Sequence, residues 1–193
     1  MKKTTKLLIS MAACAFAVLA VACGSQPKAD EAYNPDSDEA LQAAFEASAR
    51  GEELRKLVAE TPEAEQRDMA YLIKNMPEHD REAMDLELLK ENVTYANIAR
   101  NKYVWTKELP EEVYLCDVLP YAVVDEVRDS WRKELYGIFA PEVEGCATMY
   151  DAICAVNANI PRLTGVDYNT LREKTNQSPS ESMRQGMASC TGL

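Results

Sequence analysis

Apolar residues recur every three or four positions along most of the chain after residue 38, which is the spacing of one face of an α-helix. This pattern predicts a helix from Glu39, ended by Gly51 at its C′ position, and a short helix after it. A third helix is predicted between Thr61-Pro62, as its capping pair, and Pro77, and a fourth over about residues 81–100. The apolar residues on these faces are Leu41, Ala44, Phe45, Leu54, Leu57, Val58, Met69, Leu72, Ile73, Met76, Met84, Leu86, Leu89, Val93 and Ile98.

The second half of the chain keeps the helical pattern, with clearer breaks. Pro110 opens a helical turn that Leu119-Pro120-Tyr121 ends. Helices are then predicted over about residues 126–139, with Val127, Trp131 and Leu135 on one side, and over about residues 146–160. Residues 165–177 are predicted to form a polar loop, and neither a repeat nor strong strand alternation is present. The chain as given is therefore predicted to be mainly α.

The first 22 residues have the pattern of an export signal. Three lysines form a basic start, and residues 7–21 form an apolar run without a charged residue. This run is shorter than the roughly 20 apolar residues of a transmembrane helix and has the length of a signal h-region. Small residues follow, and Leu19-Ala20-Val21-Ala22-Cys23 resembles the lipobox of bacterial lipoproteins.

The lipobox resemblance implies that cleavage falls before Cys23 and that its thiol carries a diacylglycerol, with further acyl chains such as palmitate. Several acyl chains hold a protein firmly on a bilayer. The expected partner is therefore the lipid bilayer of the cell envelope, at the outer membrane or cell surface rather than in the cytoplasm. The alternative is an ordinary secretory signal in which Cys23 is incidental. Residues 23–38 are polar and contain Pro27 and Pro35, which predicts a flexible tether.

The charge of the chain excludes one class of partner. The 193 residues include 32 acidic and 21 basic side chains, a net charge of −11. Three of the lysines lie in the predicted signal, so the mature chain is more acidic still. Binding to nucleic acid depends on Lys and Arg that neutralise phosphates, and such binding is therefore not expected.

Four cysteines follow Cys23, namely Cys116, Cys146, Cys154 and Cys190. In an exported protein they could oxidise, and four thiols allow three full pairings. Cys146 and Cys154 would lie about 12 Å apart along one helix, too far to form a disulfide with each other, and are interpreted as core thiols. No CxxC motif occurs and the chain has one histidine, so the sequence predicts no metal site and no cofactor.

The candidate chemistry lies at residues 178–193. Ser178 and Glu181 form a capping box, and Gly186 can end the short helix that follows. Ser189 can then cap a helix whose first residue is Cys190. A helix N-terminus lowers the pKa of a thiol and offers a backbone N–H to an oxyanion, so Cys190 is a candidate nucleophile. The alternative is a small buried thiol at the start of a helix.

This segment resembles a known nucleophile motif. Residues 177–182, Gln185-Gly186 and residues 188–193 are similar to the nucleophile segment of bacterial transglutaminase-like proteins, of the papain-like cysteine superfamily. Residues 118–121, Glu126 and Trp131-Arg132 resemble a block upstream of the catalytic domain of such lipoproteins, although Ala122 stands where they carry an arginine. Residues 71–77 resemble part of their helical N-terminal region.

The resemblance implies a parent protein with a papain-like α+β domain in which Cys190 attacks an amide or peptide carbonyl of a protein or peptide substrate. The product would be a thioester that an amine or water resolves. The family's triad is Cys, His and Asp in that order, and no histidine follows Cys190. His79 lies far upstream and is expected at the surface or at a helix entry. We therefore expect a sequence truncated just after the nucleophile motif, and an inactive chain as given.

The expected organisation is a signal over residues 1–22, the tether over 23–38, a helical N-terminal region over 39–109, and a helical lead-in with the start of the transglutaminase-like domain over 110–193. The alternative from another class is a non-enzymatic helical lipoprotein that binds a partner or a glycan at the cell surface.

Overall fold

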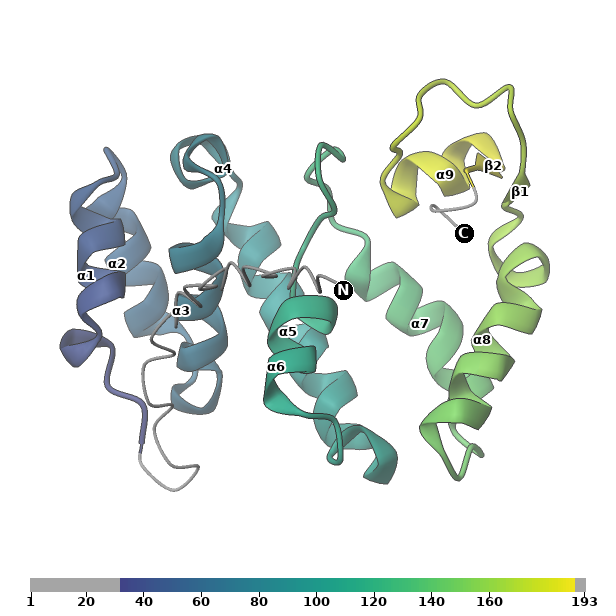
Figure 1. Ribbon diagram of the computed structural model, residues 1–193, viewed down its shortest axis with the longest axis horizontal. Helices are drawn as coiled ribbons and strands as arrows, with labels where there is room; N and C mark the ends of the chain where they lie inside the picture. The colour runs from purple at the N-terminus through teal and green to yellow at the C-terminus, as the bar shows by residue number, and fades with distance from the viewer. Residues whose placement is uncertain (1–31, 190–193) are drawn as a thin grey trace, which may run out of the picture. The chain divides into compact units, whose positions relative to one another are not determined.

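The computed structural model describes residues 32–189, and this part of the chain is mainly helical (Figure 1). The prediction of a mainly α chain is confirmed. The predicted signal, the lipidation site Cys23 and the candidate nucleophile Cys190 lie outside the described residues.

The elements before Pro120 are short helices joined by tight turns. They are η1 (Pro35–Ser37), α1 (Glu39–Glu46), α2 (Gly51–Glu60), η2 (Glu63–Glu65), α3 (Gln66–Asn75), α4 (Glu78–Ala83), α5 (Leu86–Lys102), η3 (Val104–Thr106), α6 (Glu111–Val113) and the π-helical turn η4 (Tyr114–Val118). After Pro120 follow α7 (Arg132–Val143), α8 (Met149–Thr164), β1 (Asp167–Tyr168), α9 (Pro179–Gln185) and β2 (Met187–Ala188).

Two predicted helix signals have other roles in the structure. Gly51 does not end α1 but is the first residue of α2, where a Cβ atom would lie 2.1 Å from the carbonyl oxygen of Phe45. The glycine is therefore needed for a close approach between two helices. Thr61 does not cap the following helix but ends α2, since its hydroxyl donates to the carbonyl of Leu57 at 2.8 Å.

The helix predicted over residues 81–100 is two helices. Met84, which is buried, separates α4 from α5, and the side chain of Asp85 accepts from the backbone N–H of Glu87 at 3.0 Å to begin α5. Ile98, predicted to pack in the core, is exposed. A local capping interaction thus interrupts an apolar pattern that looks continuous in the sequence.

The end of the predicted tether belongs to the folded unit. Asp38 caps α1 by accepting from the N–H of Leu41 at 3.0 Å, and it also accepts from the hydroxyl of Tyr33 at 2.7 Å and from Lys74 of α3 at 2.6 Å. The described residues 33–38 are therefore attached to the helices, and the prediction of a flexible tether up to residue 38 is wrong for them.

The main core is built by α1 to η4. Its buried apolar side chains run from Leu41 to Tyr121, and Leu54, Leu89, Tyr114 and Leu119 are among those without solvent exposure. Burial of such a side chain contributes about 1.5–3 kcal/mol. The core continues past residue 109, where the sequence suggested the start of a further region.

The helices after Pro120 contain far fewer buried apolar side chains than the helices before it. The α7 helix begins at Arg132 rather than at residue 126, and α8 packs against α7, which packs against α5 (Figure 1). Cys154 is exposed and Cys146 is half-buried, so the prediction that both are core thiols is wrong. The predicted polar loop contains β1, which pairs in parallel with β2 through the register Asp167 to Met187.

Candidate functional site

The segment that leads to Cys190 is held by a capping box, as predicted. The N–H of Glu181 donates to Ser178 Oγ at 3.2 Å, and the N–H of Ser178 donates to Glu181 Oε2 at 3.0 Å. Ser178 is fully buried, and its hydroxyl donates to Asp129 Oδ2 at 2.6 Å. Lys174 Nζ lies 2.6 Å from Glu181 Oε1. The start of α9 is therefore fixed both by its own cap and by a residue 49 positions upstream.

The end of this segment is fixed by backbone geometry. Gly186 ends α9 with a φ of 66°, in the left-handed region that favours glycine, as the sequence predicted. Strand β2 follows at once, and the N–H of Asn169, directly after β1, donates to the carbonyl of Ala188 at 3.1 Å. Ser189 is buried and is the last described residue. The predicted helix that begins at Cys190 lies outside the described residues.

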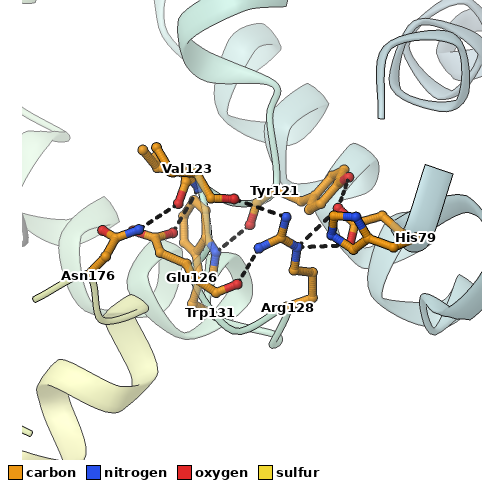
Figure 2. A network of polar contacts seen from close by, with 9 residues as sticks. His79, Tyr121, Val123, Glu126, Arg128, Trp131 and Asn176 are labelled. Carbon is orange, nitrogen blue, oxygen red and sulfur yellow. Dashed lines mark hydrogen bonds and ion pairs between the residues drawn. The ribbon is translucent and has the colours of Figure 1, made fainter. Parts of the chain in front are cut away.

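His79 lies in the first turn of α4, where its side chain is 73% exposed. Its Nε2 is 3.2 Å from Asp80 Oδ1. Asp80 is buried and also accepts from Tyr121 at 2.8 Å and, with both oxygens, from Arg128 Nε at 3.0 Å (Figure 2). Burial and the hydrogen bond to Asp80 raise the pKa of Tyr121. His79 is therefore a surface residue at a helix entry, as expected, at the edge of a structural network.

Trp131 and Arg132 fasten the connector, residues 119–131, which joins η4 to α7. Trp131 Nε1 donates to the carbonyl of Tyr121 at 2.8 Å. Arg132 donates from Nε to Asn92 Oδ1 at 2.6 Å and from Nη2 to the carbonyls of Val118, at 2.7 Å, and Pro120, at 2.8 Å. These side chains position the connector on the core.

The connector also contacts the segment before α9. Asn176 Nδ2 donates to the carbonyl of Val123 and to Asp125 Oδ1, both at 2.9 Å, and Glu126 Oε2 accepts from the N–H of Val123 at 2.9 Å (Figure 2). Val124 has a φ of 54°, which is rare for a β-branched residue. A continuous set of contacts therefore joins Asp80 in α4 to the residues just before Ser178.

The sequence did not reveal four of these positioning residues. Asp80, Arg128, Asp129 and Asn176 make contacts with residues 41 to 53 positions away. No local spacing marks such partners, and residues 126–131 were expected to be helical. A signal near this region was the helix break at Leu119-Pro120-Tyr121.

Cys116 is an exposed thiol that contacts a tyrosine. Cys116 Sγ lies 3.4 Å from the hydroxyl of Tyr71, and this contact, followed by burial, raises the pKa of Tyr71 to about 12. Within residues 32–189 no group of three or more His, Cys, Asp or Glu side chains could hold a metal ion.

Comparisons with known proteins add no family to this geometry. No family model, no curated protein and no solved structure matches the chain. Among the helices of the described part, none is long and apolar enough to cross a bilayer.

Proposed function

We propose that this chain is part of an envelope lipoprotein, tethered through Cys23, in which Cys190 is the nucleophile of transglutaminase-like chemistry. The observation that carries this proposal is the support of residues 177–189. A capping box, an ion pair from Lys174, a hydrogen bond from Ser178 to Asp129 and a strand pairing all fix the segment directly before Cys190. A catalytic group needs such support because small displacements from the productive geometry are costly in rate.

The proposed reaction is acyl transfer or hydrolysis at an amide or peptide bond. The thiolate of Cys190 attacks the carbonyl carbon, a thioester forms, and the amine leaves with a proton. A second amine or water then attacks the thioester and releases the thiol. A cysteine nucleophile of this type works with a histidine that carries the proton and a carboxylate that orients the histidine.

His79 is poorly suited to act as that proton carrier. It is exposed in the first turn of α4 and lies against Asp80, which Tyr121 and Arg128 already engage. We therefore propose that residues 23–193 alone do not catalyse the reaction, because the chain contains no histidine other than His79.

The test is to read the source DNA beyond the codon for Leu193 and to assay the protein that the reading frame encodes. Two results together would support the proposal. The reading frame continues with a His and then an Asp, and the encoded protein has an amine-exchange or amidase activity that Cys190→Ser abolishes. Cys154→Ser, at an exposed thiol, is the matched control and should leave activity unchanged. A stop codon directly after Leu193, or full activity in Cys190→Ser, would overturn it.

A further inference from the structure

A cavity of about 790 Å³ lies between the connector, η4, α7, α8 and α9. Its volume is within the range of roughly 300–1,000 Å³ that is typical of small-ligand sites. Its apolar wall is formed by Val118, Leu135, Phe139, Val156, Ile160 and Met183. Three polar groups in the lining matter for ligand binding: a guanidinium that has no charged partner, and two buried oxygens that have no hydrogen-bond partner among the described residues.

The first of these groups is the guanidinium of Arg132. The acceptors of its hydrogen bonds are the amide oxygen of Asn92 and backbone carbonyls, none of which carries a charge. No carboxylate of the described residues forms an ion pair with Arg132, and its Nη1 makes no hydrogen bond to them. Burial lowers the pKa of Arg132 to about 10. A cation in this setting favours a carboxylate partner.

The other two groups are Gln177 Oε1 and Ser182 Oγ. Both residues line the cavity and are buried, and neither oxygen has a hydrogen-bond partner within the described part of the chain. The amide orientation of Gln177 is set by its Nε2, which donates to the carbonyl of Met187 at 3.1 Å. Buried oxygens without partners are rare, because each has lost its bonds to water.

The charged residues around the cavity favour a ligand that carries both a positive and a negative charge. Asp117 and Glu126 belong to the lining together with Arg132. A simple anion would meet two carboxylates as well as the guanidinium, whereas a zwitterion has a partner for each sign.

The rim of the cavity stores backbone strain. Val123 and Val124 line it, and Val124 holds its positive φ while 82% of the residue is exposed. Arg128 Nη2 donates to the carbonyl of Val124 at 3.1 Å, and Asn176 binds the carbonyl of Val123 (Figure 2). Strained residues held by surrounding contacts concentrate at ligand clamps and active sites.

We infer that this cavity binds a short zwitterionic peptide with an apolar side chain. The free carboxylate of the peptide pairs with Arg132 and accepts from the hydroxyl of Ser182, and a ligand N–H donates to Gln177 Oε1. The ammonium group faces Asp117 and Glu126, and the side chain packs on the apolar wall. This inference concerns binding and does not depend on the chemistry of Cys190.

The experiment is calorimetric titration of the full chain in mild detergent with the tripeptide Gly-Gly-Leu, its C-terminal amide and its N-acetyl form. We expect saturable binding of the free tripeptide at millimolar concentration or below. Loss of either terminal charge should weaken binding by about tenfold, since a charge-assisted contact is removed.

Ser182→Ala separates binding from folding. Removal of a hydroxyl that has no partner should raise thermal stability, while affinity for Gly-Gly-Leu falls about threefold to tenfold. The matched control is Ser180→Ala, on the same helix but outside this lining, which should leave affinity unchanged. Any one of three results would overturn the inference. These are no detectable binding of Gly-Gly-Leu, equal affinity for the amidated or acetylated peptide, and unchanged affinity in Ser182→Ala.

Discussion

Asp80 holds two residues of the connector in place. It is buried, and its two oxygens accept from Tyr121 and Arg128 and lie against His79. The contacts with Arg128 and His79 differ in exposure, because the side chain of Arg128 is 17% exposed and that of His79 is 73% exposed. The contact with Arg128 should therefore carry most of the energy.

Asp80→Asn tests this difference. The variant keeps the shape of the side chain but leaves Arg128 as an unpaired, largely buried cation, so we expect the free energy of unfolding to fall by about 3 kcal/mol. His79→Ala removes only an exposed contact and should change it by less than about 0.5 kcal/mol. Urea denaturation measures both values. A loss in Asp80→Asn no larger than that in His79→Ala would contradict this account.

Asp68 gives the protein a defined pH dependence. Burial raises the pKa of Asp68 above the usual range of an aspartate, against the opposing effect of the hydrogen bonds from Tyr114 and Asn97. The folded state therefore holds this proton more tightly than the unfolded state. Between the unfolded and the folded pKa, the contribution of Asp68 to the free energy of unfolding falls as pH rises.

Asp68→Asn should remove this contribution. The difference in unfolding free energy, variant minus wild type, is expected to become more positive as pH rises from about 4 toward neutrality. Urea titrations of both proteins at matched pH values measure this slope. The contributions of the other carboxylates are the same in both proteins and cancel in the difference. A flat difference, or one that falls with pH, would show that the pKa of Asp68 is not raised.

At the scale of elements, the sequence predicted helices well where their signals are local. The apolar face of α3 follows from the spacing of nearby residues, and so do the capping box and the glycine stop of α9. The structure contains all three features. Residues 126–131 were expected to continue α7 because Val127, Trp131 and Leu135 share a helical face. They are not helical in the structure, where Arg128 binds Asp80 and the nearby carbonyls of Val124 and Glu126. The bond to Asp80 joins residues 48 positions apart, and periodicity does not reveal such a contact.

Val124→Gly measures the strain in this connector. Glycine adopts a positive φ without the steric cost of a β-branched side chain, so we expect a gain of about 1 kcal/mol in the free energy of unfolding. Val123→Gly is the neighbouring control, since its φ is not positive and the substitution should cost roughly 0.5–1 kcal/mol. Thermal and urea unfolding measure the sign of the change in the free energy of unfolding for both variants. A loss of stability in Val124→Gly would contradict the claim of strain.

Ser178→Ala tests whether α9 and the strand pairing act as one element. The variant removes the helix cap and the bond to Asp129, which should cost about 1–2 kcal/mol. Faster hydrogen exchange is expected at the N–H of Asn169, which donates to Ala188. Thr148→Ala, which removes the cap of α8, should leave that amide unchanged. Unchanged exchange in Ser178→Ala would show that the cap and the strands are independent.

At the scale of the molecule, the apolar core and the candidate site occupy different parts of the described chain. The core cluster ends at Tyr121, whereas the cavity, the strained rim and the segment before Cys190 are built mostly from residues after it. Helical periodicity predicted a mainly α chain, and most of the predicted core residues before residue 100 are buried. The conformation of the connector could not be predicted, because its contacts with Asp80 and Asn176 join residues 41 to 53 positions apart.

The central claim is that Cys190 is an activated nucleophile, and its alkylation rate tests this claim most directly. Iodoacetamide reacts with thiolates, so the full chain is treated over a range of pH and the modification of each cysteine is followed by peptide mass spectrometry. Cys154, an exposed thiol on α8, is the internal reference. The account predicts that the rate–pH profile of Cys190 has its midpoint below the value of about 8.5 for a free thiol and below that of Cys154. A midpoint at or above that of Cys154 would contradict it.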